Sequence, residues 1–440
     1  MKVFPVSLGC DKNSVDTEVM MGYLKEKGYE FTLDENEADI ALVNTCSFIN
    51  DAKEESINTI IELGQLKEDG NLKAIVVAGC LGQRYTEDVR NELPEVDAIV
   101  GINSLDSVVE AVDKAVKGIK GEYIDPLDRK PVKNPERVIT TGGYYDYLKI
   151  AEGCDKHCTY CAIPLFKGNY RSIPMEDLLE EAANLAARGV KELILVAQET
   201  TVYGTDIYHK KSLPELLHNL CKIDGLEIIR VLYLYPEEIS DEIIETIKSE
   251  PKIAHYIDMP IQSGSNKILK LMGRRTSREQ IYELVAKLRE EIPDICLRTT
   301  LISGFPGEDE DAQLETLGMV KDLRFDRLGV FAYSEEEGTP AALLGDKVPE
   351  EVKEARRDEI MSLQQQISFE KTAELVGNRM WAIIEGSIPE ENIYVGRTYR
   401  DIPDVDGYVF IDADRELLSG DIVEVEIKAT DEYDLIGGLL

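Results

Sequence analysis

Three cysteines in one short loop constrain this chain more than any other feature. Cys154, Cys158 and Cys161 lie in the segment Gly153–Pro164, GCDKHCTYCAIP, at the spacing C-x3-C-x2-C. Thiolates so close together form a soft ligand set that suits zinc or an iron–sulfur cluster. Structural zinc sites are usually closed by four ligands, whereas this loop supplies three. The loop therefore favours a cluster with one metal position left open for a small molecule.

Residues 1–117 repeat a pattern of a strand followed by a helix. The strands are short apolar runs rich in β-branched residues, as in buried parallel sheets, and they are predicted at Val3–Leu8, Ile40–Asn44 and Ala74–Ala78. Helical patterns follow at 15–27 and 52–66. This alternation predicts an α/β domain with a doubly wound parallel sheet.

A cysteine follows each of these three strands within two residues: Cys10, Cys46 and Cys80. They are 36 and 34 residues apart, yet the carboxyl ends of parallel strands share the edge of the sheet where ligands bind. Gly9 and Gly79 precede two of them and allow a tight turn or a close backbone approach. Three unrelated cysteines packed in a core are the alternative. The threefold repetition of one loop position favours a second site with three thiolate ligands.

Residues 118–143 are rich in proline and glycine among charged residues and are predicted to be a linker. From residue 144 to 373 a second series of strands and helices begins. Six strands are predicted, at 147–150, 192–197, 227–233, 256–259, 296–301 and 327–331. The main helices are predicted at 175–188, 213–223, 241–250, 278–291 and 311–323. Six such units indicate an incomplete (β/α) barrel, with its active site at the carboxyl ends of the strands.

The C-terminal part changes its pattern again. Pro349–Glu374 is predicted to be a charged amphipathic helix, and residues 374–440 alternate polar and apolar side chains between glycines and prolines. This predicts a small all-β barrel of about five strands. From Leu375 on the chain has 15 acidic and five basic side chains. We expect a cluster of aspartates there to dock a basic partner: Asp401, Asp404, Asp406, Asp412 and Asp414.

Net charge limits the partners of the chain. Its 440 residues carry a formal charge of −36, which disfavours strong binding of nucleic acid and attracts basic proteins. No apolar run reaches membrane-spanning length, and the N-terminal segment lacks signal-peptide architecture. With no sign of secretion we expect a cytoplasmic monomer with reduced cysteines. Cys221 and Cys296 are then small packing residues.

Taken together, the order of parts resembles the methylthiotransferases of the radical S-adenosylmethionine (SAM) superfamily over essentially the whole chain. Within that family it is most similar to the branch that modifies a ribosomal protein. One departure is Asp11, where the family pattern has proline. The resembling segments are Ser7–Glu18, Asn44–Ser56, Gly79–Tyr85, Ala151–Gly168, Gly396–Gly407 and Asp431–Leu435.

The resemblance implies a fold and a chemistry. The C-terminal barrel would be a TRAM domain, and each cysteine set would hold a 4Fe-4S cluster. The cluster on Cys154, Cys158 and Cys161 would bind and reductively cleave SAM, and the cluster on the N-terminal cysteines would carry the sulfur. The product would be a methylthio group on the β-carbon of an aspartate in the basic twelfth protein of the small ribosomal subunit. Because no base in water can usefully ionise such a C–H bond, a radical is implied and no acid–base residue is assigned.

The resemblance also implies contacts to SAM at the strand ends. Arg298 would pair with the SAM carboxylate, and Gln198 and Glu199 would contact its amine or ribose. Ser303–Gly307 is similar to the glycine-containing SAM loop of the family. The sulfur donor and the electron donor are not identified by the sequence.

Two alternatives remain open. One is the MiaB branch of the family, which modifies a transfer RNA adenosine beside the anticodon and should carry a basic C-terminal barrel. The other is a non-catalytic interaction protein stabilised by zinc, which should have closed sites with four ligands.

Overall fold

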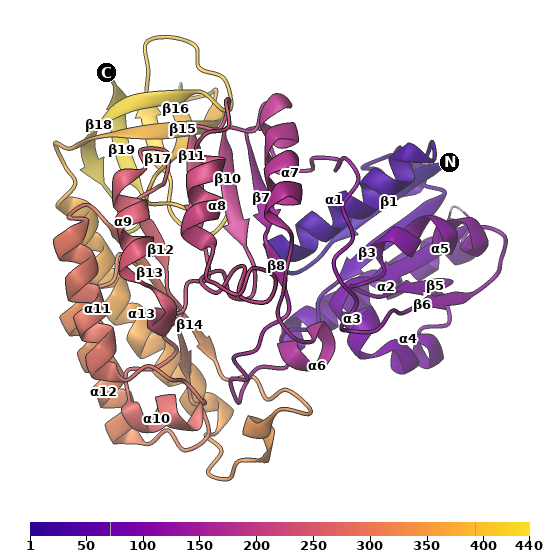
Figure 1. Ribbon diagram of the computed structural model, residues 1–440, viewed down its shortest axis with the longest axis horizontal. Coiled ribbons are helices and arrows are strands. Elements are labelled where there is room, and N and C mark those ends of the chain that lie inside the picture. The colour runs from indigo at the N-terminus through magenta and orange to yellow at the C-terminus, as the bar shows by residue number, and fades with distance from the viewer. Residues whose placement is uncertain (71, 392) are drawn as a thin grey trace.

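The computed structural model of the protein describes residues 1–70, 72–391 and 393–440, and its N-terminal domain confirms the predicted parallel sheet (Figure 1). Six strands pair in the order β2-β1-β3-β4-β5-β6. Their bounds are Lys2–Ser7 (β1), Glu30–Phe31 (β2), Ile40–Thr45 (β3), Ala74–Ala78 (β4), Ala98–Val100 (β5) and Gly121–Tyr123 (β6). Strand β6 comes from residues that the sequence analysis assigned to the linker, so the sheet extends past residue 117. The following residues, 124–143, form neither helix nor strand.

Helices cover both faces of this sheet, as a doubly wound fold requires. The first face packs against α1 (Asp11–Glu26) and α5 (Val108–Ala115). The second packs against α2 (Asn50–Glu68), α3 (Gly79–Arg84) and α4 (Thr86–Glu92). The strand order reverses between β1 and β3, and the crevice at such a switch point is where open α/β sheets bind ligands.

The central domain has the six predicted strands in two parallel sheets of three. One has the order β11-β10-β7 and the other β12-β13-β14. Their bounds are Tyr145–Lys149 (β7), Glu192–Val196 (β10), Ile228–Val231 (β11), Tyr256–Asp258 (β12), Cys296–Ser303 (β13) and Arg327–Ala332 (β14). A single bridge between Ile229 and Ile253 marks the junction of the two sheets. The open side between β7 and β14 makes the barrel incomplete.

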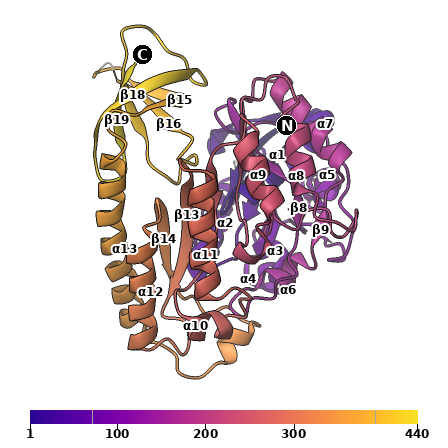
Figure 2. The same cartoon turned by 60° about the vertical axis from the view of Figure 1, so that its left-hand side comes forward.

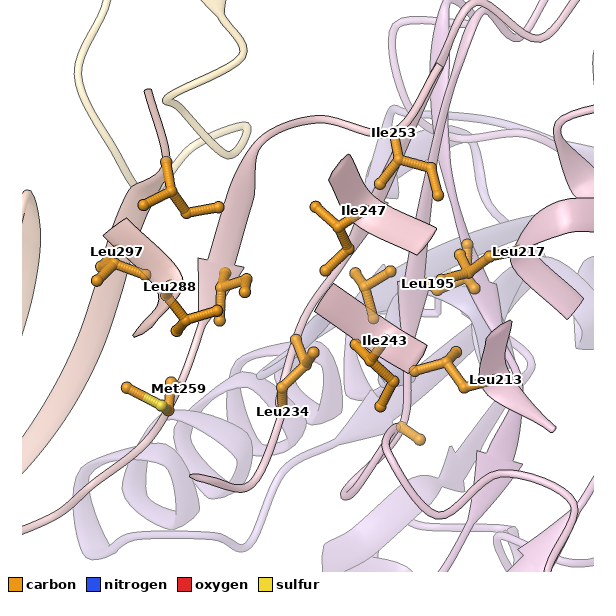
Figure 3. Close-up of a cluster of buried hydrophobic side chains, with 14 of the residues drawn as sticks. Leu195, Leu213, Leu217, Leu234, Ile243, Ile247, Ile253, Met259, Leu288 and Leu297 are labelled. Atoms are coloured by element: carbon orange, nitrogen blue, oxygen red, sulfur yellow. The ribbon is translucent and has the colours of Figure 1, made fainter. Parts of the chain in front are cut away.

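Helices pack outside these strands and close the main core. They are α7 (Met175–Ala187), α8 (Leu213–Leu220), α9 (Asp241–Ser249), α11 (Arg278–Glu291) and α12 (Glu310–Leu323). Figure 3 shows part of this core, in which Leu195 of β10 meets Leu213 and Leu217 of α8 and Ile243 of α9. Shorter elements lie near the carboxyl ends of the strands: β8 (Ala151–Glu152), α6 (Ile163–Lys167), β9 (Arg171–Ser172) and α10 (Asn266–Leu271). No helix in the described part of the chain is both long and apolar enough to cross a membrane.

The C-terminal domain is the predicted small barrel. Helix α13 (Glu350–Ala373) runs along the central domain and leads into it (Figure 2). Five strands close in the order β15-β16-β17-β19-β18. Their bounds are Arg379–Ile388 (β15), Ile393–Thr398 (β16), Val409–Asp412 (β17), Ile422–Thr430 (β18) and Leu435–Leu439 (β19).

The end of β16 and the residues that follow it cover the amino ends of the central strands through buried ion pairs. Glu192, the first residue of β10, accepts hydrogen bonds from Arg397 Nη2 at 2.7 Å and from Arg230 Nε at 3.0 Å. All three side chains are fully buried. Because a buried charge is tolerated only when it is paired and hydrogen-bonded, this triad fixes the C-terminal barrel on the central domain.

The same contact corrects two expectations about docking aspartates. Asp401 pairs with Arg327, the first residue of β14, at 2.5 Å and is 1% exposed. Asp406 accepts a hydrogen bond from the Tyr256 hydroxyl at 2.8 Å, and its side chain is nearly inaccessible. Asp401 neutralises Arg327, and Asp406 binds the Tyr256 hydroxyl, each at the start of a central strand. The prediction that these two aspartates are exposed docking groups is therefore wrong. The exposed ones are Asp404, Asp412 and Asp414.

We predict that Glu192→Gln loosens the C-terminal barrel. The amide leaves the buried Arg230 without a carboxylate partner and leaves Arg397 with Glu385 alone, so unfolding should become easier by about 3 kcal/mol. Urea unfolding followed by circular dichroism measures the shift. The matched control is Glu227→Gln, an exposed position just before β11, which should change stability by less than about 0.5 kcal/mol. Equal midpoints for the two variants would contradict the assigned role.

Candidate functional site

The first cysteine loop lies at the carboxyl ends of the central strands. Cys154 follows β8, and its backbone N–H donates to Gly168 O at 3.2 Å. The N–H of Thr159 donates to Met272 O at 2.9 Å, which ties the loop to the segment after α10. Lys156 reaches Glu238, after β11, with 2.5 Å between Nζ and Oε1. The loop is thus held from three sides at the position where such barrels have their active sites.

Positive charge and burial define the chemistry of this loop. Arg274 Nη1 lies 3.9 Å from Cys158 Sγ, and the Tyr235 hydroxyl lies at the same distance. Burial raises the pKa of Cys154 and of Cys161 to about 12. These thiols are therefore protonated at neutral pH, and metal binding must displace their protons. The buried thiols of Cys154 and Cys158 and the half-buried thiol of Cys161, with a guanidinium near Cys158, suit an anionic cluster.

The second cysteine set gathers at the switch point of the N-terminal sheet. Cys10 is the N-cap of α1, Cys46 follows β3, and Cys80 lies in the first turn of α3. A Cβ on Gly9 would lie only 2.6 Å from Cys46 Cβ, so glycine is required where the two loops meet. Its φ of +92° is also a conformation that favours glycine. The predicted close approach is present.

Two asparagines hold the three strand ends together. Asn13 Nδ2 donates to Leu8 O at 2.9 Å and to Thr45 O at 3.0 Å, and its Oδ1 lies 3.8 Å from Cys80 Sγ. Asn44 Nδ2 in turn donates to Asn13 O at 2.8 Å. The sequence analysis gave Asn13 no functional role. Its position could have indicated this role, because Asn13 lies three residues after Cys10 and thus one helical turn into α1.

Asp11 takes the place of the family proline without disturbing this arrangement. It is the first residue of α1, a position where proline and acidic residues are both favoured. Its carboxylate pairs with Lys12 at 2.8 Å, and the Lys12 ammonium lies 3.6 Å above the ring of Tyr233 from the central domain. The departure therefore changes a contact between the domains and leaves Cys10 as the N-cap.

The two cysteine sets face each other across α6. Cys80 packs against Ala162 and Phe166, which directly follow the first cysteine loop, and both views place α6 beside α3 (Figures 1 and 2). Arg84 of α3 adds a polar tie, since its Nη1 donates to Ser47 O at 3.2 Å and to Glu336 at 2.8 Å. The domains thus bring six thiols to one interface.

The spacing of the donors bears on which metal they fit. Within the described ranges no group of three cysteine, histidine or acidic side chains is tight enough to hold a single metal ion. In a four-iron cluster each thiolate binds a different iron, so the sulfur atoms stand farther apart than in a zinc site. Each cysteine set also supplies three thiols, one fewer than the four ligands that usually close a structural zinc site.

Gln198 and Glu199 lie where the sequence predicted, directly after β10 and next to the first cysteine loop. Glu199 is buried, its Oε2 lies 3.5 Å from Lys156 Nζ, and burial raises its pKa to about 8. Gln198 donates to Glu152 at 2.9 Å. In the described chain Gln198 Oε1, Glu199 Oε2 and the Tyr170 hydroxyl are buried without a hydrogen bond. These atoms are available to a bound molecule.

The structure does not bring Arg298 to the cysteine loop. It is the third residue of the eight-residue strand β13, near the amino end. Its Nη1 donates to Asp258 at 2.9 Å, and its Nε lies 3.7 Å from Asp406 of the C-terminal barrel. Arg298 is also the third residue of the predicted strand 296–301, so the expected contact with SAM did not follow from the strand bounds. Its guanidinium serves the contact between the domains.

The glycine-containing loop after β13 uses several of its polar groups internally. Gly304 N donates to Glu308 at 2.9 Å, and the Ser303 hydroxyl donates to Lys353 O at 3.0 Å. Phe305 is buried against Tyr333, with ring centroids 5.3 Å apart. The loop therefore packs beside the first cysteine site, since Tyr160 of that site lies against the same apolar cluster as Phe305.

Comparisons with known proteins agree with this arrangement. Residues 2–101 match the Uncharacterized protein family UPF0004, residues 148–320 the Radical SAM superfamily and residues 376–440 the TRAM domain. Radical SAM membership implies SAM and a 4Fe-4S cluster. Among solved structures, the radical SAM methyltransferase TsrM from Kitasatospora setae matches with a TM-score of 0.57 at 15% identity, covering 78% of this chain and 77% of TsrM. Such a likeness shows the fold alone.

Three curated relatives are similar over almost the full length, and all are called ribosomal protein uS12 methylthiotransferase RimO. The protein of Lachnoclostridium phytofermentans is 56% identical, with 99% of each chain covered. That of Clostridioides difficile is 48% identical, covering 100% of this chain and 99% of the relative. That of Clostridium botulinum is 47% identical, covering 99% and 98%. With its two cysteine sites, central barrel and TRAM domain, the chain belongs to the RimO family of radical SAM methylthiotransferases.

Proposed function

We propose that this enzyme adds a methylthio group to the β-carbon of an aspartate in uS12, the basic twelfth protein of the small ribosomal subunit. The observation that carries the proposal is the pair of three-cysteine sites facing each other across α6. One site activates the substrate carbon and the other presents the sulfur. The names of the relatives support the choice of uS12.

Cys154, Cys158 and Cys161 would hold the 4Fe-4S cluster that supplies reductive cleavage of SAM when bound. The chain's own groups around it bind and orient. Lys156 and Arg274 balance negative charge at the site. The unsatisfied oxygens of Gln198 and Glu199 are placed to accept hydrogen bonds from the SAM amine or ribose. Burial of this pocket excludes water from a reactive intermediate.

Cys10, Cys46 and Cys80 would hold a second 4Fe-4S cluster with its fourth position open. The support is the equivalent position of these residues after three neighbouring strands and the burial of Cys46 and Cys80, which raises the pKa of Cys80 to about 12. With three thiols and no fourth cysteine ligand, the site would supply a cluster able to bind sulfur next to the first site. The sulfur and electron donors are separate proteins or small molecules that these residues do not specify.

The exposed charge of the C-terminal barrel supports a basic protein substrate. Two of its five basic side chains, Arg397 and Arg400, are buried in the contact with the central domain. Asp404, Asp412 and Asp414 remain exposed. An acidic surface speeds encounter with a basic protein and repels RNA phosphates. All eight cysteines are free thiols, which fits the reducing cytoplasm that we propose as the location.

We predict that replacing Cys154, Cys158 and Cys161 by alanine removes one cluster. Iron should fall from about eight to about four atoms per chain, because each cluster contributes four. Release of 5′-deoxyadenosine from SAM should cease. Iron analysis after anaerobic reconstitution and chromatography of the nucleoside products measure both. Cys221→Ala is the matched control and should keep all the iron. An unchanged iron content in the triple variant would exclude the ligand set.

A second prediction concerns the N-terminal cysteines. Replacing Cys10, Cys46 and Cys80 by alanine should spare cleavage of SAM but stop addition of the methylthio group, because the two sites come from separate domains. Mass spectrometry of a uS12 peptide gives the product, and 5′-deoxyadenosine is measured in the same reaction. A folded variant that retains one cluster yet loses both activities would contradict this division of labour.

A third prediction tests the partner. Changing Asp404, Asp412 and Asp414 to lysine should slow association with uS12 and leave SAM cleavage intact, because exposed opposite charges mainly speed encounter. Association of the unchanged protein should weaken with salt, since the Debye length is about 8 Å at physiological ionic strength. Stopped-flow kinetics with uS12 and with an anticodon stem-loop measure both. Preference of the unchanged protein for RNA would assign it the MiaB-type substrate instead.

A further inference from the structure

A cavity of about 80 Å³ lies at the junction of the N-terminal and central domains. Its walls come from α1, from the loop after β5, from linker residues 129–134 and from the stretch between the end of β7 and the residue after β9. Apolar side chains, among them Val19, Ile102 and Ile173, stand there beside charged ones. A concave site with apolar walls and a few polar groups is the usual form of a small-molecule site.

The charge of this lining is opposite to that of the whole chain. Four lining side chains are cationic and two are acidic, although the chain carries a formal charge of −36. The cations are Arg129, Lys130, Lys149 and Arg171, and the acids are Asp106 and Glu152. The neighbouring cavity along the linker has no such excess, because three cations and four acids line it. A positive lining in so acidic a protein attracts an anion.

Arg171 supplies the buried part of this charge. It is 9% exposed, and the described chain gives its guanidinium no ion pair. Its Nη atoms donate instead to neutral oxygens at 2.7–3.1 Å, those of Lys167, Asn169 and Asn103. Burial outweighs the nearest acids and lowers the pKa of Arg171, yet an arginine stays protonated in proteins. The hydrogen bonds hold the guanidinium in place and leave its charge without a counter-charge.

The other three cations differ in how far carboxylates neutralise them. Arg129 has two carboxylate partners. Lys149 shares Glu152 with Lys167, each at 3.1 Å. Lys130 is exposed and forms no ion pair with any residue that the structure describes. It therefore adds a second positive charge that the protein does not balance.

We propose that this cavity binds a small organic anion, a carboxylate on a short apolar body. The carboxylate would accept hydrogen bonds from Arg171 Nε, which has no partner in the described residues, and from the third donor of Lys149. The apolar body would contact Val19 and Ile173. Inorganic phosphate suits the cavity less, because apolar walls offer its remaining oxygens no hydrogen bonds. Such a site would be independent of the chemistry at the cysteines.

A ligand in this cavity would touch both domains and the linker between them. Only the docked arrangement of the domains forms the complete set of walls, so the ligand would bind that arrangement in preference to a separated one. Binding to the folded state alone raises stability in proportion to the occupancy of the site. The bound carboxylate should therefore raise the midpoint of thermal unfolding of the full chain.

The test titrates propionate into the full chain by isothermal titration calorimetry. Propionamide serves as the uncharged analogue, and inorganic phosphate represents the competing class of anion. We expect saturable binding of propionate at one site per chain and none of propionamide at the same concentrations. Arg171→Met should weaken propionate binding about 10- to 100-fold, the range for a hydrogen bond to a charged group. Phosphate that binds more tightly than propionate would overturn the carboxylate assignment.

Lys130→Glu is the second variant, because Arg171→Met also removes hydrogen bonds that tie β9 to its neighbours. It changes only an exposed side chain and should weaken propionate binding about 2- to 10-fold. Lys133→Glu is the matched control, since Lys133 lies three residues further along the linker and lines the neighbouring cavity. It should leave propionate affinity unchanged. Equal affinities for these two variants would overturn the proposal, and so would propionamide that binds as tightly as propionate.

Discussion

The structure depends on the cost of burying charge without a partner. At the amino ends of the central strands, Glu192 lies between Arg230 and Arg397, and at the carboxyl ends Lys149 lies between Asp16 and Glu152. Each network takes members from two domains, so neither is satisfied unless those domains dock in one orientation. Apolar contacts alone would allow the domains to shift against one another. The paired charges do not allow this, and they determine where the N-terminal and C-terminal domains lie on the central barrel.

That fixed docking is what places the two cysteine sets opposite each other. Both sets stand at the carboxyl ends of parallel strands, one at the switch point of an open sheet and the other at the mouth of an incomplete barrel. Helix α6 is short enough to lie between them, with Phe166 against Cys80 and Lys167 within the charge network. The two cysteine sets are thereby brought together on one frame.

Much of this could be predicted from the sequence, because strands with long β-branched runs and cysteines at equal loop positions are local signals. Periodicity predicted the six central strands and the five-stranded barrel. Sheet topology predicted that Cys10, Cys46 and Cys80 meet. The partners of charged side chains were not predicted. Arg298 was expected to meet SAM but lies against Asp258 and Asp406, because the carboxylates that pair with a guanidinium come from segments far away in the sequence.

Only the exposed part of the chain's net charge can act on a partner, so buried and exposed charged residues have to be counted separately. In the C-terminal barrel, Arg397 forms an ion pair with Glu192 of the central domain, and Arg400 forms one with Asp326. Asp401 and Asp406 are likewise turned inward. The buried groups largely cancel, and what remains on the surface is an excess of carboxylates with few cations among them. A TRAM barrel built to grip RNA needs its arginines outside, where phosphates can reach them. Here two of the five basic residues instead hold the barrel in place, so the same packing that anchors the domain also removes it from the electrostatics of an RNA-binding surface.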